Sequence, residues 1–268
     1  MGKNKKREIP TWDLPIIETH CHLDYLKDLP TQEILEKSKK SNIEKVVTIA
    51  VEPGNLDAVI AISNQFDNVY CTQGIHPHEA KKIDQTVLDK IVANLALPKV
   101  VAVGEIGLDY HYDNSPRQEQ REFFEKQLQI AVDHDYPVVI HTRDADEDTV
   151  AILKNFSSSL KRKGVIHSFT SGMDLAKFCL DEGFHLGFNG IITFNSAQNV
   201  RNILDITPLE RILVETDAPF LTPVPYRGRE NAPYYLPFVI EKIAEVKNET
   251  IEEVLKKTYK NAFDVFKF

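Results

Sequence analysis

The segment Ile16-Ile17-Glu18-Thr19-His20-Cys21-His22 decides between the two folds that the rest of the chain allows. It opens with β-branched residues, as a buried strand does, and it closes with two histidines. An open doubly wound sheet would carry a glycine-rich, phosphate-binding turn after its first strand. Here the strand runs into His20-Cys21-His22 instead. The segment therefore favours a closed (β/α)8 barrel of the TIM type, an α/β fold, over the doubly wound sheet.

Short apolar runs alternate with longer amphipathic stretches along the rest of the chain. Nearly continuous apolar character predicts parallel strands that are buried on both faces. Apolar residues at helical spacing predict helices over 31–41, 116–133 and 248–263. Eight strands that alternate with helices in about 250 residues match a TIM barrel. The predicted strands are 15–18, 45–51, 69–74, 100–105, 137–141, 164–167, 185–190 and 211–217.

No linker, low-complexity segment or internal repeat divides the chain of 268 residues. We therefore expect one barrel domain over 14–268, preceded by a flexible basic tail over 1–13. No apolar run approaches the ~18–20 residues that cross a bilayer, so we expect no membrane association. Three scattered cysteines without a C-x-x-C pair favour the cytoplasm.

The net charge of −8 argues against broad, non-specific coating of DNA, which needs a positive surface. This net charge does not exclude a small local phosphate-binding site. Nothing in the sequence indicates an obligate protein partner.

Ionisable side chains gather where the predicted strands end. In a parallel barrel these ends meet at one mouth, where barrel enzymes carry their chemistry. Side chains two apart on a strand share a face, so His20 and His22 can both enter the barrel while Cys21 points into packing. The candidate metal ligands at the mouth are His20, His22, Glu105, His141, His167 and Asp217.

Four histidines and two carboxylates form a mixed nitrogen and oxygen set that suits divalent ions such as Mg, Mn or Zn. The set is too large for one catalytic ion, which takes about three protein ligands and keeps a position open. Two ions about 3.5–4 Å apart, bridged by a carboxylate, would use all six residues. Glu105, at the end of the fourth strand, is the expected bridge.

Several stretches of the chain resemble motifs of the TatD family of metal-dependent hydrolases. The resemblance runs from about residue 16 to 263. It departs at Glu18, where the family usually has Asp, and we expect this to change the orientation of nearby histidines rather than to remove a metal. The stretches are ETHCHLD at 18–24, GIHPH at 74–78, GEIGLDY at 104–110, PVVIHTRDA at 137–145, HSFTSG at 167–172, LVETDAPFLTP at 213–223 and RGRENAP at 227–233.

The resemblance implies a TIM-like barrel and a divalent-metal phosphodiesterase, commonly a 3′→5′ exonuclease on single-stranded DNA and sometimes RNA. It also implies that a metal-activated water attacks the phosphodiester, and Asp217 can act as the general base. By the same resemblance, His20, His22, Glu105 and Asp217 hold one ion, and Glu105, His141 and His167 hold the other.

Further basic residues could contact the substrate phosphates. For His78 and Arg229, a substrate contact and a simple surface role are equally plausible. Arg227 and Arg229 lie in a loop broken by Gly228, so both could be exposed loop charges. The candidate substrate contacts are His76, His78, Arg143, Arg227 and Arg229.

Aromatic residues near the mouth could stack a terminal base, because aromatic platforms suit unpaired nucleotides. Tyr110 and Phe169 are the candidates, and packing at the rim is an equally good interpretation of both. His111, His134 and His185 are assigned to structural or surface positions.

Two bound ions would outweigh the charges of Glu105 and Asp217, so the mouth would be locally cationic on an acidic protein. This favours trimming of single-stranded ends or short oligonucleotides over cutting of long duplexes. One alternative is an amidohydrolase acting on a cyclic amide or lactone, a group that often bridges its metals with a carboxylated lysine. A second is a catalytically silent metal-binding protein, although such a protein has little reason to keep six converging ionisable groups.

Overall fold

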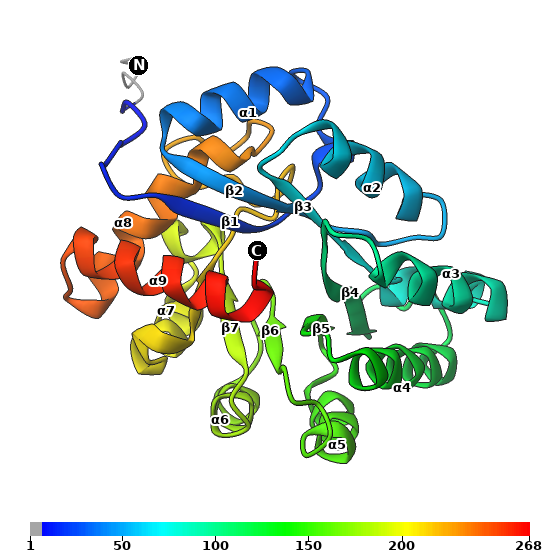
Figure 1. Cartoon of the computed structure of the whole chain (residues 1–268). Coiled ribbons are helices and arrows are strands. Elements are labelled where there is room, and N and C mark those ends of the chain that lie inside the picture. The colour runs from blue at the N-terminus through cyan, green and yellow to red at the C-terminus, as the bar shows by residue number, and fades with distance from the viewer. Residues whose placement is uncertain (1–6) are drawn as a thin grey trace.

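Parallel strands form one eight-stranded sheet in which each strand pairs with the next in chain order (Figure 1). The computed structural model describes residues 7–268. The strands are β1 (Ile16–Cys21), β2 (Ile43–Thr48), β3 (Val69–Gln73), β4 (Val100–Asp109), β5 (Val138–Arg143), β6 (Gly164–Ile166), β7 (His185–Phe188) and β8 (Ile212–Val214).

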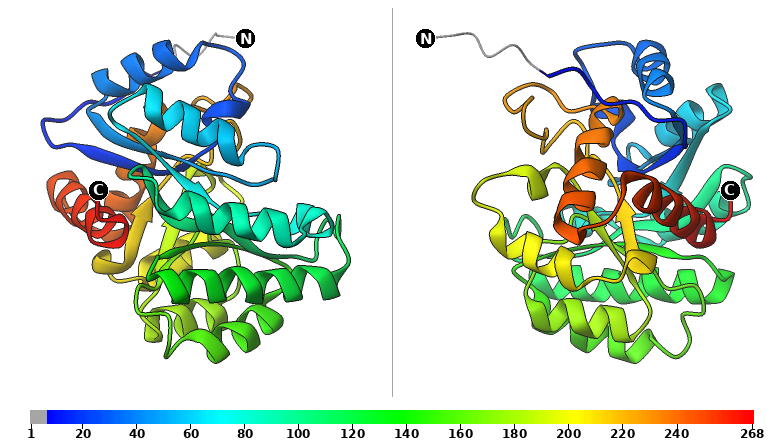
Figure 2. Two further views of the ribbon diagram at one scale, coloured as in Figure 1. Left: turned by 45° about the vertical axis from the view of Figure 1, so that its right-hand side comes forward. Right: turned by 90° about the vertical axis from the view of Figure 1, so that its left-hand side faces the viewer.

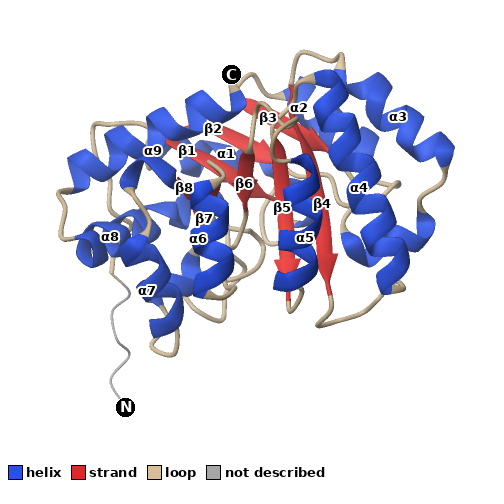
Figure 3. Ribbon diagram, turned by 90° about the horizontal axis from the view of Figure 1, so that it is seen from below, coloured by secondary structure: helices blue, strands red, loops and turns tan. Residues whose placement is uncertain are grey.

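Helices surround the sheet on its outer face, so that the strands lie at the centre of the molecule (Figures 2 and 3). They are α1 (Thr31–Lys40), α2 (Leu56–Gln65), α3 (Gln85–Leu95), α4 (Arg117–His134), α5 (Asp146–Phe156), α6 (Met173–Asp181), α7 (Gln198–Ile206), α8 (Leu236–Lys247) and α9 (Ile251–Phe266).

The segment after β8 returns to β1 and completes the ring. The backbone N–H of Asp217 donates to the carbonyl of His20 at 2.9 Å, and the N–H of His22 donates to the carbonyl of Ala218 at 2.7 Å. The predicted TIM-type barrel is confirmed. Because the closing contacts involve residues 20, 22 and 217 themselves, the closure of the fold also places three of the predicted ligands side by side.

The inside of the barrel is filled at one end by apolar side chains from several strands. Ile17, Val47 and Val101 belong to a buried apolar cluster that also includes Val265 and Phe266 of α9. The last helix therefore covers the end of the barrel where the strands begin. The other end, where the strands finish, is left for polar side chains.

The predicted elements overlap the observed ones and differ at their ends. β1 runs to Cys21 and β4 runs to Asp109, both beyond the predicted ends at 18 and 105. β4 continues because its partner β5 continues, with Asp109 opposite Arg143. α9 begins at Ile251 rather than at 248, because the side chain of Thr250 accepts the N–H of Glu253 at 3.1 Å and caps the helix there.

The predicted flexible tail, 1–13, lies partly outside the described residues, which begin at 7. Arg7 forms an ion pair with Glu241 on α8. The side chain of Asn42 donates to the carbonyls of Trp12 and Asp13 at 3.1 and 2.9 Å. Residues 7–13 thus contact the barrel, and the boundary at 14 stays a prediction.

Within residues 7–268, none of the helices combines the length and apolar character needed to cross a bilayer.

Candidate metal centre

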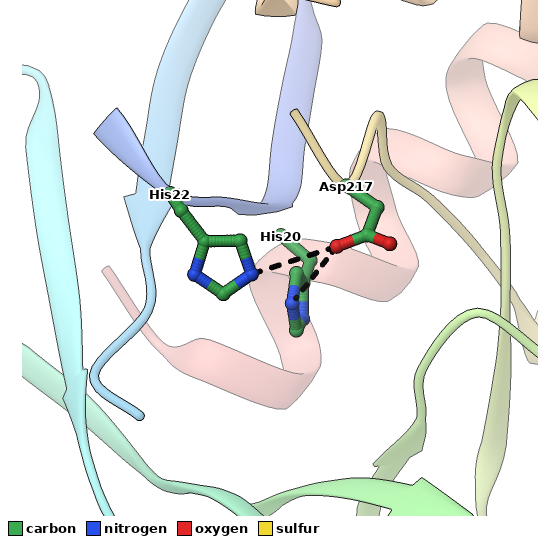
Figure 4. Close-up of side chains that lie close together, drawn as sticks. All are labelled: His20, His22 and Asp217. Atoms are coloured by element: carbon green, nitrogen blue, oxygen red, sulfur yellow. Dashed lines mark ion pairs between the residues drawn. The ribbon is translucent and has the colours of Figure 1, made fainter. Parts of the chain in front are cut away.

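The first group of predicted ligands sits at the junction of β1 and β8 (Figure 4). His20 is on β1, His22 directly follows it, and Asp217 follows β8 with a left-handed φ of 56°. Oδ1 of Asp217 is 3.5 Å from Nε2 of His22 and 3.7 Å from Nε2 of His20. Two imidazole nitrogens and one carboxylate oxygen therefore converge on one point.

Glu105, on β4, lies between this first group and a second one. Its Oε2 is 3.4 Å from Nε2 of His20. Its Oε1 is 2.8 Å from Nε2 of His167 and 3.1 Å from Nδ1 of His141. The side chain is buried, and its two oxygens face opposite groups, which is the position that a bridging ligand needs. The structure thus brings all six predicted ligands together at the mouth.

His76, predicted as a phosphate contact, is placed within the second group. Its Nε2 is 3.4 Å from Oε1 of Glu105, and its donor atoms cluster with those of Glu105 and His141. The backbone N–H of His78 donates to Nδ1 of His76 at 3.1 Å, which turns Nε2 of His76 inward. Geometry therefore makes His76 a further possible nitrogen ligand, next to the six predicted residues.

The donor atoms fit divalent cations. Both ring nitrogens of His20 are buried and have no hydrogen-bond partner among the described residues, although carboxylates surround the ring. Burial, reinforced by the neighbouring His167, lowers the pKa of His20 and keeps its imidazole neutral. A neutral imidazole with a free lone pair that faces carboxylates is the form in which histidine binds a metal ion.

The two carboxylates are held in their ionised form. Burial alone would raise the pKa of Glu105, but the adjacent imidazoles of His167 and His76 hold it well below its ordinary value. Burial opposes ionisation of Asp217 as well, but the hydrogen bond from His22 and the nearby rings of His20 and His167 together outweigh it, so the pKa of Asp217 is lowered. Both groups are therefore available as anionic ligands.

Asp109 is a site residue that the sequence reasoning missed. Its Oδ2 is 3.0 Å from Nε2 of His141 and 3.0 Å from Nε2 of His78. Its Oδ1 accepts the backbone N–H groups of His111 and Tyr112. Because Nε2 of His141 is engaged by Asp109, Nδ1 is the nitrogen that faces Glu105. A longer predicted β4 would have pointed to Asp109, because residues 105 and 109 are four apart on one strand and share a face of it.

Two further carboxylates lie behind the ligands. Oε1 of Glu18 accepts the N–H groups of His20 and Thr216, each at 3.0 Å, and so links β1 to β8. Burial raises the pKa of Glu18 to about 8. Oε1 of Glu215 accepts the N–H of Ser168 at 2.7 Å. Glu18 thus contacts the backbone of His20 rather than its ring, and its effect on the orientation of the histidines stays a prediction.

A cavity of about 750 Å³ opens over the ligands. Of the predicted substrate contacts, His76, His78 and Arg143 line it. Arg227 and Arg229 do not. The guanidinium of Arg227 lies over the ring of Phe194 at 3.8 Å, and that of Arg229 lies over Tyr226 at 5.6 Å. The structure therefore does not bring these two arginines to the metal centre.

Tyr110 and Phe169, expected either to stack a base or to pack at the rim, do not line the cavity. Phe169 is buried in the apolar core, and the hydroxyl of Tyr110 donates to Asp148 outside the cavity. The aromatic side chains exposed in the cavity are Tyr112 and Phe220, at 55% and 52% exposure. Tyr110 and Phe169 belong to motifs near the mouth, but the direction of the chain after each strand decides which aromatic side chain faces the cavity.

The three histidines assigned to structural or surface positions lie outside the ligand groups. His111 is exposed and pairs with Asp144, and His134 is exposed at the end of α4. His185 is buried at the start of β7, at the opposite end of the barrel from the ligands.

Comparison with known proteins identifies one protein family over the whole barrel. The family model described as TatD related DNase matches residues 17–267. An uncharacterised metal-dependent hydrolase of Bacillus subtilis, YabD, is 37% identical over 253 residues, which cover 94% of this chain and 99% of the relative. The Escherichia coli hydrolase YcfH, also uncharacterised, is 36% identical over 259 residues, with 94% and 95% coverage. The crystal structure of YjjV, a TatD homologue from Escherichia coli, superposes with a TM-score of 0.89 at 29% identity, over 94% of this chain and 98% of that one.

Proposed function

This chain belongs to the TatD family of metal-dependent hydrolases, and from that premise we propose that it is a two-metal phosphodiesterase that trims single-stranded DNA from the 3′ end. The description of the family model, TatD related DNase, supports a nucleic acid as substrate, and RNA would present the same bond. The direction of trimming follows from the resemblance of the motifs to those of the family.

The observation that carries the proposal is the position of Glu105. One of its oxygens faces His20 and the other faces His141 and His167, so a single unmodified carboxylate can bridge two ions. His20, His22 and Asp217 would complete one coordination sphere, and His141 and His167 the other. Two divalent ions held this way, whether Mg, Mn or Zn, would neutralise the phosphate and activate water.

The residues of this chain would divide the remaining work. Water adds to phosphorus while the bond between phosphorus and the 3′ oxygen breaks, which releases a nucleoside 5′-monophosphate and a new 3′ hydroxyl. Asp217, ionised and at the edge of the first group, would take the proton of that water. Arg143 and His78, both on the cavity wall, would hold the phosphate oxygens.

The surroundings of the cavity favour a short, unpaired end over a long duplex. Glu52 and Glu79 also line the cavity, and the whole chain carries a charge of −8. Away from the cations, this acidic rim repels further phosphates. A strand that places only its terminal phosphates in the mouth avoids most of that repulsion.

The test is hydrolysis by purified protein after EDTA treatment, with Mn²⁺ or Mg²⁺ restored. The substrates are oligodeoxynucleotides of one sequence labelled at the 5′ end, either single-stranded or annealed to a blunt duplex. We expect a ladder of progressively shorter labelled strands from the single strand, much slower digestion of the duplex, and no products without metal. Glu122→Gln, an exposed change on α4, should leave the ladder unchanged, and Glu105→Gln should abolish it.

Other outcomes would redirect the proposal. Hydrolysis of a cyclic amide or lactone without any cleavage of oligonucleotides would favour the amidohydrolase alternative. Metal binding without hydrolysis of either class would favour a silent binding protein. Label released as a mononucleotide at the first step would reverse the direction of trimming.

A further inference from the structure

Phe220 is an exposed aromatic residue on the wall of the cavity that opens over the metal ligands. Among the described residues, the large hydrophobic side chains that are exposed include Leu97, Ile206 and Phe263, none of which lines the cavity. Phe220 and Tyr112 are exposed and do line it. An exposed ring beside a binding cavity keeps its apolar face in water, so a ligand that covers the ring gains the free energy of burying it.

The backbone that carries Phe220 is fixed. Its N–H donates to the carbonyl of Asp217 at 2.9 Å, and its carbonyl accepts from the side chain of Asn231 at 2.6 Å. The next residue, Leu221, packs closely on Gly190. A Cβ added to Gly190 would lie 1.9 Å from the Leu221 carbonyl oxygen. The ring is therefore exposed on a rigid backbone. A ligand that covers it would cost the loop little conformational entropy.

Phe220 is also close to the first ligand group. Its ring centre is 6.3 Å from that of His22, with the rings inclined at 67°. It lies three residues beyond Asp217 in the same anchored segment. A phosphate on an ion held by His20, His22 and Asp217 would thus bring the base of its own nucleotide within reach of the Phe220 ring.

Tyr112, the other exposed ring, is already engaged. The guanidinium of Arg143 lies over it at 4.9 Å, and the rings of His78 and His111 contact it at 5.4 and 4.9 Å. Phe220 contacts the ring of His22 edge to face and, among the described residues, has no cation over its face. Of the two rings, Phe220 is the better placed to stack a base.

We propose that Phe220 is the specificity-determining residue that stacks the unpaired terminal nucleobase of the substrate. The inference rests on the proposed function and deepens it, because it explains how the site would select an unpaired end. Stacking on an aromatic face tolerates every base, and an unpaired terminal base can turn onto the ring, whereas a paired base is held in place by its complement. A terminal nucleotide without a base would lose this contact and keep its phosphate contacts.

The test compares two 5′-labelled single strands that differ only in the last nucleotide, which is thymidine in one and an abasic tetrahydrofuran residue in the other. With Mn²⁺, we expect the parent protein to show a KM about 10-fold lower for the strand that ends in thymidine. Phe220→Ala should raise that KM about 10-fold, with little change in kcat, and leave the KM of the abasic strand unchanged. Phe220→Tyr should behave as the parent does.

Phe263→Ala is the matched control, because Phe263 is exposed to a similar degree on α9, away from the cavity. Its kinetics should equal those of the parent. The inference is wrong if Phe220→Ala affects both strands equally or neither. It is also wrong if Tyr112→Ala, and not Phe220→Ala, removes the preference for thymidine. If the parent cleaves neither strand, the proposed function itself fails, which is a separate result.

Discussion

The same eight strands end in two different environments. At one end, the apolar cluster that contains Ile17, Val47 and Val101 fills the barrel, and Phe266 of α9 closes it. Where they finish, imidazoles and carboxylates meet around Glu105, and several of their polar atoms have no partner among the described residues. Apolar packing stabilises the first end. The second concentrates groups whose burial costs free energy unless a ligand compensates for it.

Two buried histidines sharpen this contrast. Burial lowers the pKa of both His20 at the mouth and His185 at the opposite end. His20 faces the carboxylates of Glu105 and Asp217, whereas His185 has the cation of Arg211 beside it. A buried neutral imidazole is thus common to both ends. The carboxylates around His20 make the mouth a binding site for cations.

The largest effect should come from Glu105→Gln, which removes the one carboxylate that both groups share. Loss of a residue that hydrogen-bonds to a metal ligand costs about 10–100-fold in metal affinity or activity. Loss of a ligand that both ions share should cost more than that. We expect hydrolysis of single-stranded DNA to fall by more than about 100-fold. We also expect Mn²⁺ to raise the Tm of the parent and not that of the variant, because binding to the folded state stabilises it.

Glu122→Gln on α4 is the control for the change of charge, and it should keep both responses. A Glu105→Gln protein that still gains Tm with Mn²⁺ to the same extent as the parent would show that the carboxylate does not hold the ions.

A change at the closed end should have the opposite signature. Phe266→Ala removes a buried ring from the cluster that contains Ile17 and Val47, and we expect a loss of about 3–5 kcal/mol in the free energy of unfolding. Urea unfolding measures it. At a temperature where the variant is folded, the Mn²⁺ affinity should match that of the parent. A weakened affinity would mean that the two ends of the barrel are coupled.

The fold was predictable because its signals are local. Runs such as 45–51 and 100–105 combine β-branched residues with burial on both faces, and each predicted strand overlaps an observed one. The candidate ligands followed from the same signals, since the carboxyl ends of the parallel strands meet at the mouth of the barrel. Only the ends of strands and helices were displaced, because capping decides where a helix begins and pairing with the neighbouring strand decides where a strand ends.

The surroundings of the ligands were less predictable because they depend on contacts between distant segments. Phe220 faces the cavity because Asn231, eleven residues away, holds its carbonyl. Phe169, in an equally suggestive motif, is turned into the core. Asp109 reaches His141 only because β4 continues beyond Glu105. Periodicity does not report such contacts.

Asp109→Asn tests how far the mouth depends on these outer contacts, and its effect should be smaller than that of Glu105→Gln. The amide keeps the size of the side chain but loses the charge that holds His141 and His78. We expect Mn²⁺ affinity, measured by calorimetry, to fall about 10–100-fold. Asp113→Asn, an exposed change in the loop that follows β4, is the matched control and should leave the affinity unchanged. An unaltered affinity in Asp109→Asn would remove Asp109 from the site.

The smallest effect should appear at His185, as a dependence of stability on pH. Burial, followed by the nearby Arg211, lowers the pKa of His185 to about 4, below the ordinary value of about 6.5 in the unfolded chain. As the pH falls below 6.5, the unfolded chain takes up a proton that the folded protein refuses until about pH 4, so folding stability is lost across that window. His185→Gln removes this group, and we expect the loss of unfolding free energy between pH 7.5 and pH 5 to be about 1–2 kcal/mol smaller than in the parent. His134→Gln, at an exposed position on α4, should leave the pH profile unchanged. Identical profiles for the parent and His185→Gln, measured by urea unfolding without metal, would mean that acid sensitivity arises at the mouth rather than at the closed end.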